Sequence, residues 1–220
     1  MLASRKVRQR ETASVTDQLP QSLHPVIRRI LLARKVTDES SLDLRLGRLQ
    51  PPATLSGIDK AADILAQAVV SGQRILIVGD FDADGATGTA VAVRALHMLG
   101  AEHVDFRVPN RFEFGYGLTT GLVETLADDP PDVLVTVDSG ISSNAGVERA
   151  RELGCKVVIT DHHLPGEHLP QADAIVNPNC PGDQFPSKAL AGVGVIFYLM
   201  SVLRKALREL DWFTFPRSEP

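Results

Sequence analysis

The feature that most constrains the fold is a regular alternation of short apolar segments with longer segments of helical periodicity. The apolar segments are nearly continuous runs of Val, Ile and Leu, with RILIVG, DVLVTVD and KVVIT as the clearest examples. Such runs are typical of parallel strands that are buried on both faces of a sheet. We therefore expect an α/β fold with a mainly parallel five-stranded sheet flanked by helices, whose strands are residues 75–79, 104–108, 133–137, 156–160 and 173–176.

Helical periodicity fills most of the chain between these strands. The first half of the leader is rich in charge and contains an amphipathic segment at 23–36, so we expect a flexible start followed by helices. The organisation predicted from this pattern is a helical leader over residues 1–72 and an α/β domain over residues 73–220. Further helices are expected at 58–70, 87–100, 118–129, 142–154 and 188–210.

Composition narrows the functional classes. The net charge of −4 argues against a binder that relies on a basic patch, although bound metal cations can reverse the field of an acidic site. The longest apolar run, 189–203, is shorter than the roughly 20 residues that span a bilayer, so we expect no membrane segment. Cys155 and Cys180 lack metal-ligand spacing and are expected to be free thiols in a reducing cytoplasm.

Polar residues gather where the expected strands end. Because ligands in open α/β sheets bind at the carboxyl ends of the strands, we expect these residues to share one edge. Clustered carboxylates repel one another unless a cation compensates them, and oxygen ligands with an imidazole suit Mn²⁺ or Mg²⁺. The prediction is a site for two such ions, built from Asp80, Asp82, Asp84, Asp138, Asp161, His162 and His163, with Asn177 at the same edge.

Each of these residues also has an ordinary structural interpretation. An Asp at a strand end is often a helix cap or a turn residue, and an isolated His is usually structural. The metal-site prediction therefore depends on the convergence of several strand ends and on the adjacent pair His162–His163, which follows Asp161.

Four better-known motifs are excluded. DFDADG opens like an EF-hand loop, but the twelfth position counted from Asp80 is Val91 where a Glu is needed, and the segment follows a strand. The phosphate-binding pattern G-x-x-x-x-G-K-[ST] and the dinucleotide pattern G-x-G-x-x-G after the first strand are both absent. The nucleophile pattern G-x-S-x-G is absent as well.

The segment after the aspartates has two interpretations. Gly85 is expected to let the chain turn sharply into the next helix. Thr87, Gly88 and Thr89 would then open that helix, where their N–H groups either face a phosphate or serve as a simple cap.

Three segments together resemble a known family. GDFDADGATGTA, VTVDSG and TDHH are similar to the first three motifs of the DHH phosphoesterase superfamily, and the resemblance extends from LHPVIRRILLARKV to AGVGVIFYLM. Within it, the chain most resembles RecJ-type exonucleases. Val78 stands where pyrophosphatases of the superfamily carry His, and NRFEFGYGLT and LAGVGV are RecJ-like. The resemblance implies degradation of single-stranded DNA from the 5′ end, with Mn²⁺ or Mg²⁺, in recombination and repair.

The same resemblance implies individual roles. It indicates metal binding by Asp82, Asp84, Asp138 and His162, with Asp80 as a further ligand or supporting carboxylate. His163 and Asp161 are expected to serve catalysis, with His163 at the scissile phosphate and Asp161 as a ligand or a support. Substrate contacts are expected from Arg111 to phosphate, from Tyr116 to a base, and from Thr87. Arg111 could equally be a solvated loop residue, and Tyr116 could only pack its loop.

The chain departs from the family in one respect. The family carries a further metal-ligating Asp in a G-T-x-A-D-like segment beyond the LAGVGV helix, and this sequence ends at WFTFPRSEP. We therefore expect an N-terminal piece of a longer enzyme. Two alternatives remain open at this stage: a phosphodiesterase for short or cyclic oligonucleotides, and a non-catalytic fragment that binds metal or a partner protein.

Overall fold

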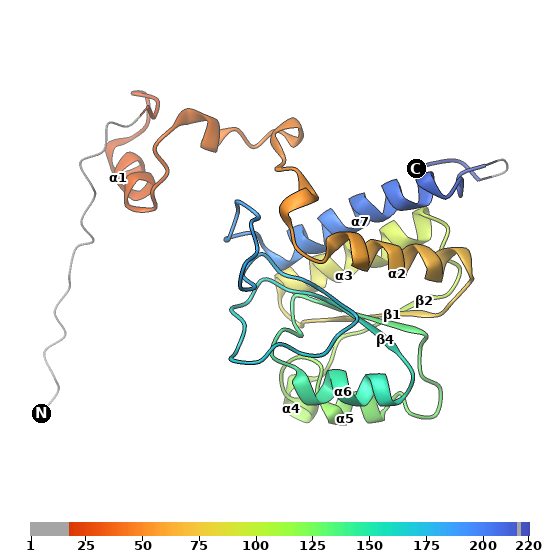
Figure 1. The fold of residues 1–220 in the computed structure, drawn as a ribbon. Helices are drawn as coiled ribbons and strands as arrows, with labels where there is room; N and C mark the ends of the chain where they lie inside the picture. Colours follow the sequence, from red (N-terminus) through yellow and green to blue (C-terminus); the bar gives the residue numbers. More distant parts are fainter. Residues whose placement is uncertain (1–17, 215–216) are drawn as a thin grey trace, which may run out of the picture. The chain divides into compact units, whose positions relative to one another are not determined.

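A computed structural model of the chain describes residues 18–214 and 217–220 (Figure 1). The chain divides into two compact units, Met1–Gln50 and Pro51–Pro220. The flexible start expected from the sequence falls on residues 1–17 and lies outside the described residues.

The described part of the first unit is helical. Its helix α1, Pro25–Ala33, begins with a proline whose missing N–H costs nothing at that position, and His24 caps it by accepting a hydrogen bond from the N–H of Val26. Two 3₁₀ turns, Glu39–Leu42 and Leu46–Arg48, follow. The structure thus has a helix within the amphipathic segment at 23–36.

The second unit is built on a five-stranded sheet with every pairing parallel and the order β2-β1-β3-β4-β5. The predicted fold class is confirmed. Every residue of β1 and β3 is buried, which explains why both strands read as continuous apolar runs. The strands are β1 Ile75–Gly79, β2 Val104–Arg107, β3 Val133–Val137, β4 Lys156–Thr160 and β5 Ala174–Val176.

Helices cover both faces of this sheet (Figure 1). One face carries the longer helices, which bury Leu65, Leu96 and Leu199 in the larger core. The other face carries the shorter helices over a second core that contains Val123 and Val147. The first group is α2 Ile58–Val70, α3 Ala83–Met98 and α7 Gly192–Glu209, and the second is α4 Arg111–Phe114, α5 Thr120–Glu124 and α6 Asn144–Glu152.

Three helix boundaries differ from the sequence-based prediction by more than two residues. The helix expected at 118–129 ends at Glu124 and continues as turns, and the helix expected from residue 188 begins at Gly192. The helix expected from residue 87 begins at Ala83, because Asp82 accepts hydrogen bonds from the N–H groups of the first turn. The short helix α4 was not predicted.

The expected role of Gly85 is also wrong. Gly85 is a residue of α3 and does not form a turn. A Cβ atom at this position would lie 2.5 Å from the carbonyl oxygen of Asp80. Glycine is needed here because the helix packs directly against the backbone at the end of β1.

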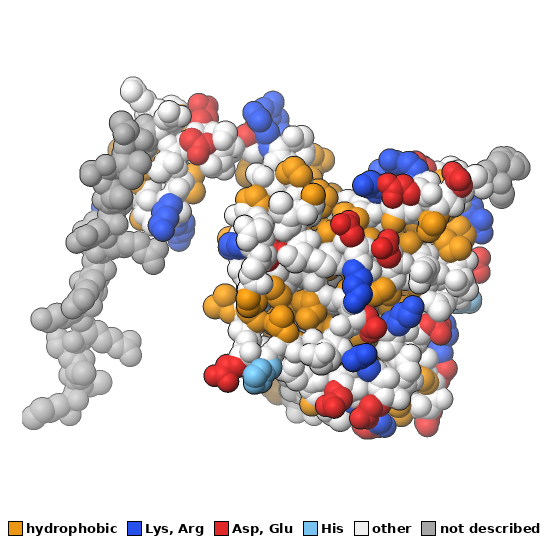
Figure 2. Space-filling view, in the orientation of Figure 1, with side chains coloured by type: hydrophobic (Ala, Val, Ile, Leu, Met, Phe, Trp, Pro, Cys, Tyr) orange, Lys and Arg blue, Asp and Glu red, His pale blue; other side chains and the backbone are white. Residues whose placement is uncertain are grey.

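The surface is mixed in charge. Figure 2 shows acidic and basic side chains interspersed over the face of the second unit that it presents. No helix in residues 18–214 is both long enough and apolar enough to cross a membrane.

Candidate functional site

The sheet register aligns three aspartates at its carboxyl edge. Gly79 pairs with Val137, and Val137 pairs with Thr160, so the three central strands end level with one another. The residue that follows each of these strands is an aspartate. Its backbone N–H donates a hydrogen bond of 3.0 to 3.3 Å to a carbonyl oxygen of the neighbouring strand, so the ladder continues by one bond. The sequence-based expectation of one shared edge is thereby met for Asp80, Asp138 and Asp161.

Asp138 occupies an unfavourable position. It adopts a left-handed backbone conformation with φ of 61° and is 1% exposed. Its Oδ1 has no hydrogen-bond partner among the described residues, although His162 Nε2 lies 3.1 Å away without hydrogen-bond geometry. Burial, followed by the charges of Asp84 and Asp82, raises the pKa of Asp138 to about 7. A buried, unpaired carboxylate oxygen is what a bound cation would satisfy.

Two further carboxylates face the same point. Ligand atoms of Asp80, Asp82 and Asp138 lie within 4.8 Å of one another. Burial raises the pKa of Asp80, and the neighbouring Asp82 adds to that effect. Asp82 Oδ1 also caps α3 by accepting from Asp84 N and Gly85 N at 2.9 Å each. The D-x-D spacing thus places one carboxylate at the strand end and the next at the helix cap.

Asp84 joins the site in a way the sequence did not indicate. Its Oδ2 accepts from Gly192 N at 2.8 Å and its Oδ1 accepts from Val193 N at 2.7 Å. The carboxylate therefore holds the N-terminus of α7, where the helix dipole favours a negative charge. Gly192 must be glycine for this approach, because a Cβ there would lie 2.5 Å from Asp138 Oδ1.

The two histidines lie beside these carboxylates. His162 Nε2 is 3.1 Å from Asp138 Oδ1 and 3.6 Å from Asp84 Oδ2. Ligand atoms of Asp138, His162 and His163 form a second group within 4.8 Å. Asp138 is the residue that both groups share.

Asp161 is buried with both oxygens occupied. Its Oδ1 accepts from the N–H groups of His162 and His163 and from His163 Nδ1, and its Oδ2 accepts from Ile141 N. Partial burial opposes the charged form of His163, but the hydrogen bond and charge of Asp161 outweigh it, so the pKa of His163 is raised. The geometry makes Asp161 a support for the histidines.

A cleft of about 410 Å³ opens beside the site, and Asp80, Asp82, Tyr116 and His163 are among its lining residues. Tyr116 directs its hydroxyl at the carbonyl oxygen of Asp138, 3.4 Å away. Burial and the surrounding carboxylates, with Asp80 first among them, raise the pKa of Tyr116, so it stays a neutral donor.

The other two residues expected to contact substrate, Arg111 and Thr87, do not line this cleft. The guanidinium of Arg111 lies 4.2 Å from the centre of the Phe81 ring, a half-exposed aromatic residue that also lines the cleft. Thr87 lies in the second turn of α3, where its hydroxyl donates to the carbonyl oxygens of Ala83 and Asp84. The expectation that Thr87 opens the helix is therefore wrong, because the helix begins four residues earlier.

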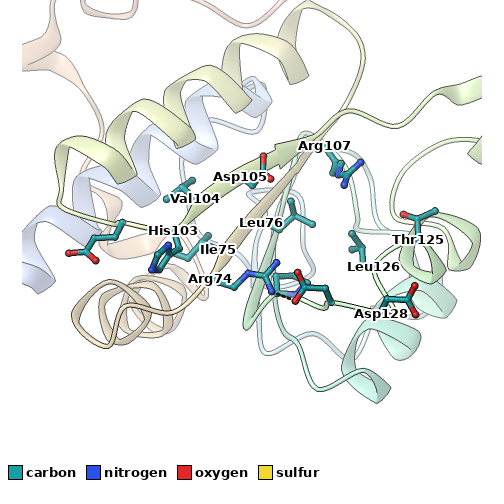
Figure 3. A pocket seen from close by; sticks show the side chains of 13 residues that line it. Arg74, Ile75, Leu76, His103, Val104, Asp105, Arg107, Thr125, Leu126 and Asp128 are labelled. Carbon is teal, nitrogen blue, oxygen red and sulfur yellow. Dashed lines mark hydrogen bonds and ion pairs between the residues drawn. The ribbon is translucent and has the colours of Figure 1, made fainter.

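A second pocket of about 590 Å³ lies away from these residues (Figure 3). Its lining includes Arg74 and His103, which immediately precede β1 and β2, and Arg74 is ion-paired with Asp129. It contains none of the expected site residues, so the carboxylate cluster identifies the functional site better than pocket size does.

Some residues of the site were not predicted from the sequence. Phe81 was overlooked although it separates two of the predicted ligands, and Asn179 was overlooked although it follows Asn177 by two positions. Gly192 belongs to the LAGVGV segment, which was noted without a role. All three could have been found from the sequence only because they lie next to residues or segments that the sequence analysis names.

Comparison with known proteins gives consistent results. The chain is 50% identical over 208 residues to the single-stranded-DNA-specific exonuclease RecJ of Escherichia coli strain K12. The aligned region covers 94% of this chain and 36% of that protein. It is 39% identical over 199 residues to the RecJ of Bacillus subtilis strain 168, covering 89% of this chain and 25% of that protein. The chain thus spans between 25% and 36% of the length of these two relatives.

Solved structures agree. A crystal structure of exonuclease RecJ bound to manganese aligns with a TM-score of 0.63 at 39% identity, over 70% of this chain and 38% of that chain. RecJ from Thermus thermophilus in complex with Mn²⁺ aligns with a TM-score of 0.66 at 34% identity, over 81% of this chain and 24% of that chain.

The family itself is shown by a family model described as the DHH family, N-terminal domain, which matches residues 74–214. This range contains every carboxylate and histidine of the site. The chain therefore belongs to the DHH family.

Proposed function

We propose that this chain is the DHH part of a metal-dependent phosphodiesterase that degrades single-stranded DNA from the 5′ end. The observation that carries the proposal is the convergence of Asp80, Asp82 and His162 on Asp138, whose buried Oδ1 has no hydrogen-bond partner among the described residues. The relatives named as single-stranded-DNA-specific exonucleases support the substrate class. A role in DNA recombination and repair, and a cytoplasmic location, belong to the same proposal.

The proposed cofactor is a pair of Mn²⁺ or Mg²⁺ ions. The donor set of carboxylate oxygens and one imidazole suits these ions, and solved RecJ structures contain manganese or magnesium. Asp84 is proposed as a further ligand, since a carboxylate oxygen that accepts one hydrogen bond keeps a lone pair for a metal. When bound, such ions activate a water molecule and neutralise charge on the phosphoryl oxygens.

The protein's own side chains would position the DNA strand. His163 is held through Nδ1 by Asp161, which leaves its Nε2 to contact the scissile phosphate, and its raised pKa favours the proton-donating form. Arg111 is proposed to contact a phosphate and Tyr116 to contact a nucleotide in the cleft that it lines. Thr87 remains a proposed contact from the exposed side of α3.

The direct test combines binding and cleavage. Calorimetry should show Mn²⁺ binding by the wild-type chain and much weaker binding by Asp138→Asn. Equal affinity in the two proteins would contradict the site. A substrate-length series on 5′-phosphorylated DNA, measured with the chain and with a version extended to the length of its relatives, then tests the substrate. Activity confined to very short oligonucleotides would favour the alternative substrate class.

A further inference from the structure

The dipeptide His162–His163 lies beyond the end of the sheet ladder. β4 ends at Thr160, and its neighbours β3 and β5 end at Val137 and Val176. Once the strands end, the backbone groups of the dipeptide have no ladder partners. Histidines in such a segment would be poorly oriented unless other groups bound their backbone.

Side chains bind all four of these backbone groups. On the N–H side, Asp161 Oδ1 accepts from His162 N at 2.7 Å and from His163 N at 3.0 Å. On the carbonyl side, Asn179 Nδ2 donates to His162 O at 2.6 Å, and Asn177 Nδ2 donates to His163 O at 2.9 Å. Each asparagine thus replaces one strand partner for one histidine.

The two asparagines also fix each other. Asn177 Oδ1 accepts from Asn179 N at 2.8 Å, and Asn179 Nδ2 donates a second bond to Lys188 O at 3.2 Å. Asn177 is 1% exposed, so its amide has no access to competing water. The asparagines lie at the start of the connection from β5 to α7, which therefore holds the histidine segment.

We infer that Asn177 and Asn179 are positioning residues that orient His162 and His163 for metal and phosphate. This inference rests on the proposed function and extends it to residues that touch neither metal nor DNA. Hydrogen bonds that orient metal-binding side chains are commonly worth 10-fold to 100-fold in metal affinity or activity. Asn179 is the better target because it is partly exposed, whereas replacing the buried Asn177 would endanger folding.

A matched control lies in the same connection. Lys188 Nζ donates to Pro178 O at 2.6 Å, to Asp183 O at 2.9 Å and to Asp183 Oδ1 at 3.1 Å. Lys188→Met removes these bonds but none to the histidine dipeptide. It should lower the free energy of unfolding at least as much as Asn179→Ala does.

The experiment compares wild type, Asn179→Ala and Lys188→Met in three measurements: unfolding by denaturant, Mn²⁺ affinity by calorimetry, and hydrogen exchange of the His162 and His163 amides. Asn179→Ala should weaken Mn²⁺ binding roughly tenfold and speed exchange at both amides. Lys188→Met should change stability alone. In any version that cleaves DNA, Asn179→Ala should lower kcat and leave KM for DNA unchanged, and added Mn²⁺ should restore part of the rate.

Two outcomes would overturn the inference. One is that Asn179→Ala and Lys188→Met have the same metal affinity and the same exchange rates. The other needs no variant: in the wild-type chain, the His162 and His163 amides would exchange as fast as those of residues 164–169. Failure of the wild type to bind Mn²⁺ would contradict the proposed function, while the exchange measurement would still decide whether the asparagines hold the dipeptide.

Discussion

At the scale of single residues, the site is defined by one carboxylate that the protein leaves unsatisfied. Asp138 is buried, has a left-handed backbone and carries an oxygen without a hydrogen-bond partner among the described residues. These features destabilise the metal-free fold, and they are tolerated at sites whose strain serves function. The cost of this arrangement can be measured directly.

The first prediction concerns the pH dependence of stability. The pKa of Asp138 is raised to about 7 in the folded state, from 3.8 in a model peptide. The favourable contribution of its protonated form is therefore complete below about pH 4 and is lost as the pH rises through about 7. Without metal, Asp138→Asn should be more stable than wild type by about 1 to 3 kcal/mol at pH 8, and this gain should vanish at pH 4.

Denaturant unfolding at several pH values in EDTA measures that difference. Asp128→Asn, an exchange at an exposed aspartate, is the control and should show no comparable pH-dependent gain. Saturating Mn²⁺ should reverse the order of wild type and Asp138→Asn, because a ligand that binds only the folded state stabilises it. An Asn variant no more stable than wild type at pH 8 would mean that Asp138 carries no burial penalty.

The second prediction concerns Gly192. A Cβ at this position would lie 2.5 Å from Asp138 Oδ1, so Gly192→Ala should displace the carboxylate or the helix and cost about 1 to 3 kcal/mol. It should also weaken Mn²⁺ binding. Gly194→Ala is the matched control, because its Cβ would meet only the end of the Leu190 side chain and alanine favours a helix. Equal stability and metal affinity in the two variants would contradict this account.

At the scale of elements, the site depends on how helices begin. Asp82 caps α3, and Asp84 accepts from the first N–H groups of α7, so the start of α3 carries two of the proposed ligands and also holds a distant helix. Gly88 lies where α3 packs against both β3 and α7, since a Cβ there would lie 2.6 Å from a methyl group of Val137 in β3 and 3.4 Å from the Cα of Val193 in α7.

The third prediction tests this connection. Asp84→Ala should destabilise the chain by about 1 to 2 kcal/mol even in EDTA, because two N–H groups at the start of α7 lose a charged acceptor. Hydrogen exchange of the Gly192 and Val193 amides should speed up more than that of the rest of α7. If the variant is destabilised only when metal is present, Asp84 acts solely as a ligand.

At the scale of the whole molecule, the second unit contains every element of the sheet, both cores and the whole candidate site. The described part of the first unit, residues 18–50, contributes none of these residues. The chain as a whole covers 36% of the length of the Escherichia coli relative. We therefore expect folding and metal binding to need only the second unit, and catalysis to need more than this chain.

The fourth prediction follows for the first unit. A chain of residues 51–220 should unfold cooperatively, with a Tm within a few degrees of the full chain, and should bind Mn²⁺ with the same affinity, since cores and ligands are retained. Circular dichroism and calorimetry test this. Loss of the folding transition on removal of residues 1–50 would show that the first unit stabilises the sheet.

The fifth prediction concerns activity. We expect this chain alone to hydrolyse single-stranded DNA weakly or not at all, compared with a version extended to the length of its relatives. Phosphate contacts supply most non-specific affinity for nucleic acid, and a chain of net charge −4 offers few of them. An exonuclease assay with Mn²⁺ compares the two, and similar turnover would show that the DHH part is sufficient.

The sequence by itself determined the fold class, the five strands and the edge at which the site lies. It could do so because strand burial leaves a direct apolar pattern, and because parallel strands must end at one edge when their polar residues follow them. GDFDADG, VTVDSG and TDHH were also enough to indicate the family, which the family model then confirmed.

Only the tertiary structure decided which hydrogen bonds each side chain of the candidate site makes. Asp84 and Asp138 look alike in sequence, yet one caps α7 and the other is left, among the described residues, with an unpaired oxygen. Asn179 lies 17 residues beyond the histidine whose carbonyl it binds. Such contacts depend on how the β5–α7 connection packs against the segment that follows β4. The local periodicity of the sequence does not indicate where a distant backbone group will lie.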